Sequence, residues 1–434
     1  SIVIMLSLKY NLLSILCVRA GMETCPTYII YFIIGYKKLQ GDIMIKIDIV
    51  DQEIIKDSNR KKIVQLLYKK KELTKQDISK ELEISIPTVT SNINALIKEG
   101  IVEEAGMAES TGGRKPIIIR FLPNSRYAFG VDFSLEIIRI ALTNLNSEII
   151  YETSMDIKGF YNIDEAIRKI EMEIKHILNE KKISIDKVLG IGFSLPGTVN
   201  EEDMVLEMAP NLKIKNIVFK EFTDILKLPV YIENEANAAA FAELTLGIAK
   251  EMRNLAYISI TEGIGTGIVI QDYLYKGKNK RAGEFGHMTI VADGKPCNCG
   301  KKGCWELYAS DRALIEGYCS RANQKKVSLK DFFYKLKCED PIAKEAWESY
   351  LDYLAIGIQN IILLLDPHYV VIGGKIGQYP GILESLKEKV FIQNTFYNEN
   401  DIKILISTLK ENASILGAAL LPMQKLFFIK RKII

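Results

Sequence analysis

Three short segments with helical spacing of apolar residues follow one another near the start of the chain. They run from Asn59 to Tyr68, from Thr74 to about Leu82, and from Pro87 to a stop at Gly100. Thr74 is a good N-cap, and a proline suits the first turn of a helix. The pattern therefore predicts three packed helices. Their inward-facing positions are Ile63, Leu66, Leu67, Ile78, Leu82, Val89, Ile93, Leu96 and Ile97.

Only Glu83 to Ser85 separates the second segment from the third, a spacing typical of a helix-turn-helix. Two short strands follow, Ile101–Glu104 and Ile117–Phe121, and they enclose the glycine pair and basic tip of Ser110–Pro116. This order resembles a winged helix-turn-helix. The residues expected to contact DNA are Thr88, Thr90, Ser91, Asn92 and Asn94 on the outer side of the third helix, and Arg114 and Lys115 on the wing.

A trihelical protein-interaction module is the alternative interpretation of this head. Charge favours DNA binding only weakly, because residues 57–120 hold 12 Lys and Arg against 9 Asp and Glu. The order of helices, turn and glycine-arginine wing therefore carries the prediction of DNA binding.

From Arg126 onward, apolar strands alternate with helices in two comparable halves, which favours two α/β lobes around a ligand cleft. The expected domains are 44–122 for the DNA-binding head, 123–241 for the first lobe and 242–434 for the second. The expected strands are Tyr127–Phe133, Ile137–Thr143, Ile149–Met155, Val188–Phe193, Val230–Ile232, Leu255–Ile260, Gly267–Ile270 and Tyr369–Ile372. The expected helices are Ile163–Glu180, Asn237–Leu246, Asp340–Leu365 and Tyr379–Val390.

Residues 1–43 contain apolar runs such as Tyr28–Ile34, but none reaches the roughly 18 residues of a membrane span. A convincing signal-peptide cleavage site is also missing. We expect Met44 to be the natural start and the preceding segment to be an upstream extension. A short membrane-associating or packing segment is the alternative.

The composition is that of a folded protein with 434 residues, 48% hydrophobic content and a net charge of +3. Its seven cysteines form no disulfide framework of the secreted type, so a reducing, cytoplasmic setting is expected. Cys297, Cys299 and Cys304 lie within eight residues, and His287 precedes them. Three thiolates and one imidazole make a closed tetrahedral zinc site, which predicts a structural rather than a catalytic metal. Unrelated free cysteines are the alternative.

The spacing of these four residues resembles that of the ROK family, which contains bacterial sugar kinases and repressors. The resemblance spans about Tyr127 to Leu421 and includes the stretches 192–197, 211–212, 233–237 and 373–374. It implies an actin-like, ribonuclease H-like fold for both lobes. With its helix-turn-helix, the chain resembles the repressor branch of the family, in particular repressors of xylose operons.

By this resemblance, the sugar-binding residues are Asn211, Asn234, Glu235, Glu284, His287 and Glu306. Fixed carboxylates and amides suit sugar hydroxyls, and the second ring nitrogen of His287 is free to bind one when the first binds zinc. The expected partners are operator DNA, a monosaccharide inducer such as xylose, and a second copy of the chain in a homodimer or a dimer of dimers.

Two departures from the kinase pattern predict that the chain has no catalytic residues. The stretch Asp132–Glu136 lacks the two glycines of the family's phosphate loop, and Glu235 stands where the kinases have a shorter aspartate base. The glycines at 263, 265, 267, 373 and 374 remain, and the turns themselves could require them. An ATP-dependent sugar kinase that carries a DNA-binding domain is the alternative function.

Overall fold

The computed structural model describes residues 35–39, 42–46, 52–107, 115–157, 162–392 and 396–427. The chain divides into two units, residues 1–60 and 61–434. In the first, β1 (Gly35–Leu39) pairs antiparallel with β2 (Asp42–Lys46), and α2 (Gln52–Lys70) begins. Most of the predicted extension, residues 1–43, lies outside the described residues.

The predicted starts of the second and third helices of the head are confirmed by their caps. At the start of α3 (Lys75–Leu82), the hydroxyl of Thr74 accepts from the N–H of Asp77, and the Asp77 carboxylate accepts from the N–H of Thr74. At the start of α4 (Ile86–Lys98), the hydroxyl of Ser85 accepts from the N–H of Thr88. Helix α2 begins seven residues before its predicted start. The inward-facing residues predicted for the three helices are all buried or half-buried.

The wing contains β4 (Val102–Met107) and β5 (Ile117–Phe121), as predicted. An unpredicted strand, β3 (Glu72–Thr74), pairs with β5 and completes a three-stranded sheet in the order β3-β5-β4. Most of the predicted wing tip, including Arg114, lies outside the described residues, which resume at Lys115.

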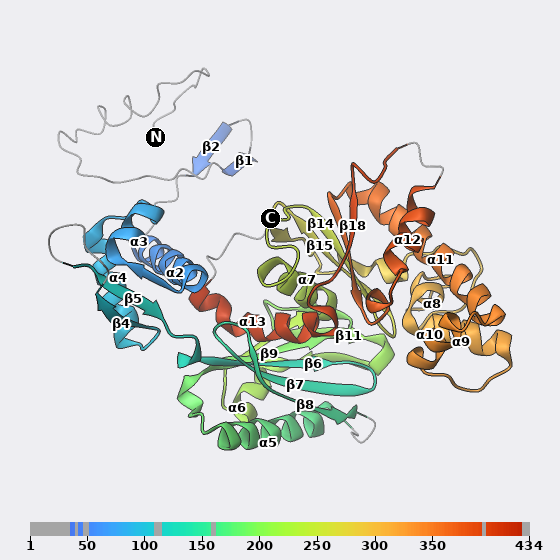
Figure 1. The fold of residues 1–434 in the computed structure, drawn as a ribbon, viewed down its shortest axis with the longest axis horizontal. Helices are drawn as coiled ribbons and strands as arrows, with labels where there is room; N and C mark the ends of the chain where they lie inside the picture. The colour runs from blue at the N-terminus through green and yellow to red at the C-terminus, as the bar shows by residue number, and fades with distance from the viewer. Residues whose placement is uncertain are drawn as a thin grey trace. The chain divides into compact units, whose positions relative to one another are not determined.

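Each lobe contains a five-stranded sheet, and the two sheets follow the same plan (Figure 1). The strand orders are β8-β7-β6-β9-β13 and β16-β15-β14-β17-β18. In each order, the first three strands pair antiparallel with one another, and the last two strands continue the sheet in parallel with the third. The first sheet comprises β6 (Tyr127–Phe133), β7 (Ile137–Asn144), β8 (Ile149–Asp156), β9 (Val188–Leu195) and β13 (Val230–Asn234). The second comprises β14 (Leu255–Ile260), β15 (Ile264–Ile270), β16 (Tyr273–Leu274), β17 (Tyr369–Gly374) and β18 (Lys403–Ile406). The repetition confirms the two comparable halves expected from the sequence.

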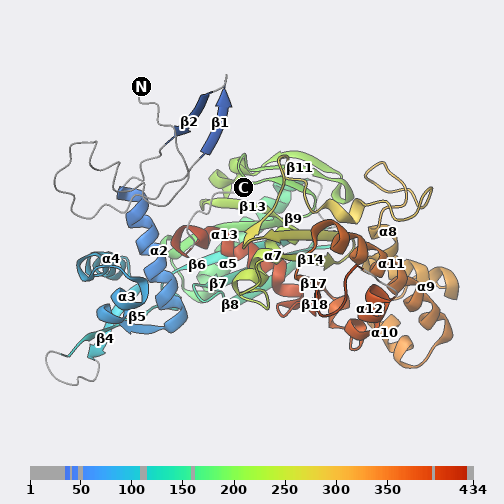
Figure 2. The ribbon, with the colours of Figure 1, turned by 90° about the horizontal axis from the view of Figure 1, so that it is seen from above.

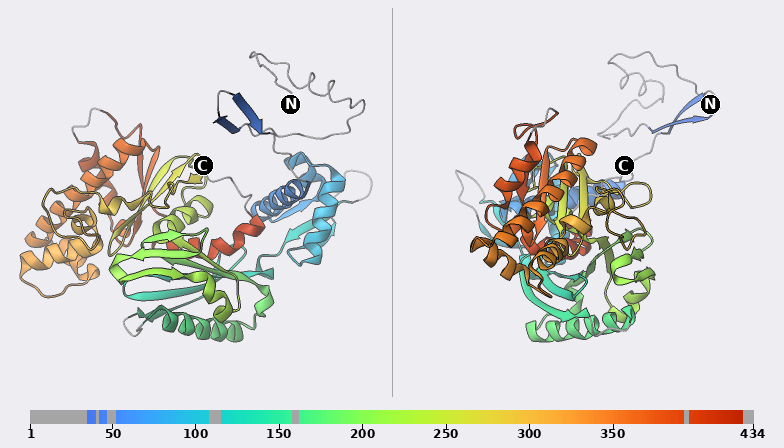
Figure 3. Two further views of the ribbon diagram at one scale, coloured as in Figure 1. Left: turned by 180° about the vertical axis from the view of Figure 1, so that it is seen from behind. Right: turned by 90° about the vertical axis from the view of Figure 1, so that its right-hand side faces the viewer.

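Helices α7 (Glu235–Thr245) and α13 (Ala413–Phe427) lie between the two sheets (Figures 1 and 2). Helix α5 (Ile163–Lys181) covers the far face of the first sheet, and α11 (Pro341–Leu365) packs on the second (Figure 3). Helix α13 packs on β6 and β9, although its residues fall in the predicted second lobe. A Cβ at Gly192 of β9 would overlap the carbonyl oxygen of Ala418 in α13. Glycine at this position therefore allows the close approach of α13 to β9.

The remaining elements lie around these layers. A small sheet contains β10 (Thr198–Asn200), β11 (Val205–Ala209) and β12 (Ile214–Val218), none of which the sequence pattern predicted. The other helices are α6 (Thr223–Leu226), α8 (Glu306–Ala309), α9 (Asp311–Ala322), α10 (Leu329–Lys337) and α12 (Ile382–Phe391). Among the helices that the structure describes, none has both the length and the apolar character needed to cross a membrane.

Candidate functional site

A tight hairpin brings the three clustered cysteines together. The backbone N–H of Cys297 donates to Lys301 O at 2.8 Å, and the backbones of Cys304 and Thr289 pair in an isolated antiparallel β-bridge. Gly303 has φ +71°, and a Cβ there would overlap the carbonyl oxygen of Val291, so only glycine fits this turn. The hairpin is anchored on α11, because the buried indole of Trp305 donates to Tyr353 O at 2.9 Å.

The ligand atoms of His287, Cys297, Cys299 and Cys304 all lie within 4.8 Å of one another. Cys297 Sγ is 3.6 Å from His287 Nδ1, and Cys299 Sγ is 3.6 Å from Cys304 Sγ. Burial raises the pKa of the Cys297 and Cys304 thiols above the ordinary value. A bound cation would favour the thiolates instead, so this cluster could hold a metal ion.

Carboxylates lie directly beside this cluster. Glu306, the first residue of α8, is only 4% exposed, and its Oε1 is 3.5 Å from His287 Nδ1 and 3.3 Å from Cys297 Sγ. Glu284 lies on the same 3-10 turn as His287, and burial together with the charge of Glu306 raises its pKa. The structure therefore brings three of the predicted sugar-binding residues together.

Glu306 and Glu235 approach one short segment, which comprises the end of the turn after β14 and the start of β15. A Cβ at Gly263 would lie 2.8 Å from Glu306 Oε2, and a Cβ at Gly265 would lie 3.5 Å from Glu235 Oε2. Each of these glycines therefore lies directly beside one of the two carboxylates. The glycines leave room for these side chains.

The two predicted asparagines are held by protein groups. The Asn234 side chain accepts from the N–H of Asn237 as the N-cap of α7, and its amide donates to Gly197 O at 2.8 Å. Asn211 Oδ1 accepts from Asn298 Nδ2 at 3.0 Å, so it lies against the hairpin of the other lobe. The fold thus uses Asn234 to position Glu235, the first residue of α7.

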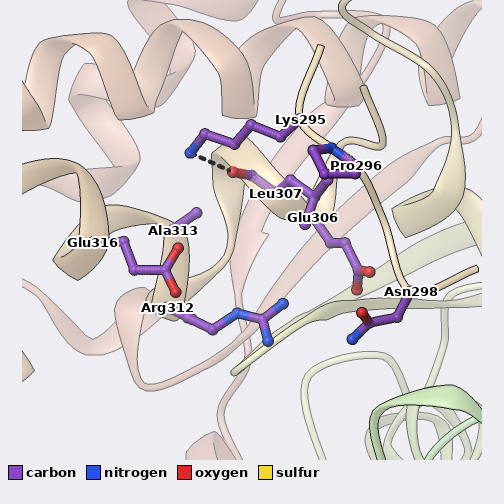
Figure 4. Close-up of a pocket in the computed structure, with 8 residues that line it drawn as sticks. All are labelled: Lys295, Pro296, Asn298, Glu306, Leu307, Arg312, Ala313 and Glu316. Atoms are coloured by element: carbon purple, nitrogen blue, oxygen red, sulfur yellow. Dashed lines mark hydrogen bonds between the residues drawn. The ribbon is translucent and has the colours of Figure 1, made fainter. Parts of the chain in front are cut away.

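A pocket of about 330 Å³ lies against the same hairpin, and Glu306 and Asn298 line it (Figure 4). Figure 4 shows Arg312 beside these two side chains, while Lys295 Nζ turns away to donate to Leu307 O at 3.2 Å. The remaining lining residues are Pro296, Ala313 and Glu316. Arg312 has no family motif around it in the sequence, so sequence analysis did not single it out.

Replacing Glu235 with glutamine is expected to flatten the pH dependence of stability. Burial and the charge of Asp132 raise the pKa of Glu235 to about 7, against about 4.3 in an unfolded chain. The folded state therefore favours the neutral carboxyl, and the stability that this gives is lost as the pH rises through 7. Thermal unfolding at pH 5 and pH 8 should show that the wild type loses roughly 1–3 kcal/mol more than Glu235→Gln. Equal losses in both proteins would contradict this expectation.

On α4, the predicted recognition helix, Ser91 and Asn94 are exposed, and Thr88 and Thr90 are half-buried. Asn92 is a correction, because it is 5% exposed rather than on the outer side. Its Nδ2 donates to Thr88 O at 2.9 Å, and the residue lies within the stripe that also contains Val89. Lys115 is exposed at the base of the wing.

The contrast between Asn94 and Asn92 gives a prediction for DNA binding. Asn94→Ala should weaken operator binding by about 1–3 kcal/mol at unchanged thermal stability, because the exposed amide can reach a base edge. Asn92→Ala should instead lower thermal stability, because it removes a buried amide from the helix. Fluorescence anisotropy with labelled operator, beside thermal unfolding, checks both. The opposite assignment of the two effects would show that Asn92 faces the DNA.

Comparisons with known proteins match both parts of the chain. The profile described as the ROK family matches residues 128–425, and one for a winged helix-turn-helix that binds DNA matches residues 56–103. The xylose repressor of Bacillus spizizenii is 33% identical over 373 residues, which cover 85% of this chain and 96% of that protein.

Solved structures extend the comparison. The crystal structure of a ROK family transcriptional regulator, a homolog of the E. coli MLC protein, is 28% identical with a TM-score of 0.75, covering 87% of this chain and 98% of that one. A ROK family glucokinase from Streptomyces griseus, solved with glucose and AMPPNP, is 25% identical with a TM-score of 0.61 and covers 69% of this chain and 99% of that one.

Proposed function

Because the chain belongs to the ROK family and carries a winged helix-turn-helix that binds DNA, we propose that it is a transcriptional repressor released by D-xylose or a related monosaccharide. The proposal rests on one observation: the same chain carries a helix-turn-helix with exposed residues on α4 and a cluster in which the carboxylate of Glu306 lies beside the imidazole of His287. The similarity to xylose repressors over most of both chains supports the choice of sugar.

Sugar recognition in this proposal falls to Glu235, Glu284, His287 and Glu306. The three glutamate side chains accept hydrogen bonds from hydroxyls, and the neutral carboxyl that burial favours at Glu235 can also donate one. Burial of Glu306 strengthens such bonds because water competes less. Arg312 and Asn298, which line the neighbouring pocket, would supply donors. A site with both kinds of group discriminates strongly between sugars that differ in one hydroxyl.

The metal proposed for the cysteine cluster is structural zinc. In a tetrahedral site with Zn–S bonds of about 2.3 Å, the ligand atoms lie about 3.8 Å apart. The 3.6 Å separations within the cluster fit this geometry, and three thiolates with one imidazole leave no position for a substrate. Zinc would hold the orientation of His287 and of the hairpin that carries Glu306, so it supports the binding of sugar.

The turn after β6 argues against phosphoryl transfer. Ser134 Oγ accepts from the N–H groups of Glu136 and Ile137, at 3.3 and 3.1 Å, and these are the backbone donors that a phosphate loop would offer to ATP. A further acidic residue, Glu262, contributes to raising the pKa of three neighbouring carboxyls, those of Asp132, Glu235 and Asp311, so additional negative charge is disfavoured beside them. We therefore propose that the kinase site is degenerate.

A symmetric dimer places two recognition helices on two half-sites of DNA, so we propose a cytoplasmic homodimer on an inverted-repeat operator. Helix α13 offers a route from the sugar to the head. Its residue Ser414 hydrogen-bonds Asp132 at the cleft, and Phe427 at its other end packs edge-on against Tyr68 and Phe121 of the head. Closure of the lobes would shift α13 and thereby the heads.

Calorimetric titration with a panel of pentoses and hexoses, followed by an assay of ADP release with the best binder and ATP, tests this proposal. We expect binding of D-xylose or a related sugar without sugar-dependent ADP release. Robust turnover would favour the alternative, a ROK kinase that carries a DNA-binding domain, for which the similarity to the glucokinase is the supporting observation.

A further inference from the structure

The loop between β16 and His287 carries a lysine that is almost fully enclosed. Lys276 is only 8% exposed, and the N–H of Ala282 donates to its carbonyl oxygen at 3.0 Å, which closes the loop on itself. An ammonium group buried in this way is costly unless carboxylates surround it. The partners of Lys276 therefore decide what the loop does.

Those partners come from the other lobe. Lys276 Nζ lies 2.5 Å from Glu233 Oε2 at the end of β13, and 2.8 Å from Glu201 Oε1 in the turn after β10. Lys280, further along the loop, pairs with Glu201 at 3.3 Å and with Glu202 at 2.8 Å. The side chains of Lys276 and Glu233 are 10% and 6% exposed, so water screens their attraction little.

Glu233 also hydrogen-bonds residues at the start of α7. Its Oε1 accepts from the N–H of Asn234 at 2.9 Å and from Asn237 Nδ2 at 3.4 Å. One carboxylate thus joins Lys276 to the first turn of the helix that begins with Glu235. On the other side, the loop of Lys276 runs directly into Glu284 and His287.

We propose that Lys276 is a positioning residue for the sugar: through Glu233, it fixes the spacing between Glu235 on one lobe and the Glu284–His287 turn on the other. This inference rests on the proposed sugar-binding function. It assigns a role to a lysine that touches neither the cysteine cluster nor the recognition helix. Sequence patterns could not reveal it, since the two ion-paired residues are 43 positions apart.

Lys276→Met tests the inference, because methionine fills similar space without the charge. In the absence of sugar, hydrogen exchange of the backbone at 234–237 and 283–287 should rise at least about fivefold, and calorimetry should give at least about tenfold weaker sugar binding at unchanged metal content. Lys276→Arg should recover most of the affinity. The exposed Lys278 lies in the same loop, and Lys278→Met should behave as the wild type.

A double variant separates positioning from simple stability. Lys276→Met with Glu233→Gln removes the unpaired buried carboxylate, so we expect its melting temperature to recover while sugar affinity stays low. Recovery of affinity together with stability would overturn the inference, as would wild-type affinity in Lys276→Met. Should Lys276→Met fail to fold, Glu201→Gln is the milder variant, because Lys280 keeps Glu202, and about threefold weaker binding is expected.

The hydrogen-exchange measurement needs no sugar, so it tests the role of Lys276 separately from the proposed sugar-binding function. Unchanged exchange in a folded Lys276→Met protein overturns the connection between the lobes, whatever the sugar titration shows. A wild-type protein that binds no sugar of the panel overturns the proposed function instead.

Discussion

Replacing Cys304 with alanine is expected to remove the metal and most of the sugar affinity together. The thiol is fully buried, and its Sγ lies 3.6 Å from Cys299 Sγ and 3.6 Å from His287 O. Without this ligand the remaining three residues form an open site, and metal affinity should fall by at least about 100-fold. His287 and Glu306 would then lose the group that holds their hairpin. Elemental analysis and calorimetry with the best sugar measure both effects.

Cys319→Ala is the matched control, because this half-buried cysteine of α9 lies outside the cluster. It should keep metal and sugar binding at wild-type values. Removal of the metal from the wild type with a strong chelator should reproduce the Cys304→Ala result. Full sugar affinity in metal-free protein would contradict the role assigned to the cluster.

Glu306→Gln is expected to produce a repressor that is released only at much higher sugar concentrations. A buried carboxylate accepts strong hydrogen bonds from hydroxyls, and such bonds to a charged group contribute about 1.5–3 kcal/mol each. Sugar affinity should therefore fall roughly 10–100-fold for each bond lost. Operator binding should not change, because the recognition helix and its core contain none of these groups. Calorimetry and operator titrations with and without sugar check the two halves.

Glu384→Gln, on an exposed position of α12, is the control for loss of a carboxylate. The metal content of Glu306→Gln must also match the wild type, since Glu306 Oε1 accepts from Cys297 Sγ. Normal release of Glu306→Gln from the operator by sugar would show that the ligand binds elsewhere.

Local signals in the sequence predicted much of the fold. The capping pair Thr74 and Asp77 marks the start of α3, and apolar runs mark eight of the ten strands in the two five-stranded sheets. The edge strands β16 and β18 were not predicted. Helix α13 escaped prediction because it is buried on all sides, so its apolar residues show no helical stripe. The strands β10 to β12 are short and partly polar, and pairing between them depends on the tertiary fold.

At the candidate site, the sequence motifs located the cysteine cluster and its neighbouring carboxylates. The prediction that Asn92 faces outward was wrong, although its spacing of three from Val89 and four from Leu96 indicates the inward face of the helix. The position of Asn234 directly before a helix likewise indicates an N-cap, because asparagine is a preferred residue there. The partnership of Lys276 with Glu233 depends on the fold alone.

Titration of a protein–operator complex with D-xylose tests the central claim most directly. An operator is first selected from random DNA duplexes, labelled, and bound by the full chain, and fluorescence anisotropy then follows its release. We predict that D-xylose or a related monosaccharide raises the operator Kd at least about tenfold, which is a coupling free energy of about 1.4 kcal/mol. An operator Kd that no sugar of the panel changes would contradict the account.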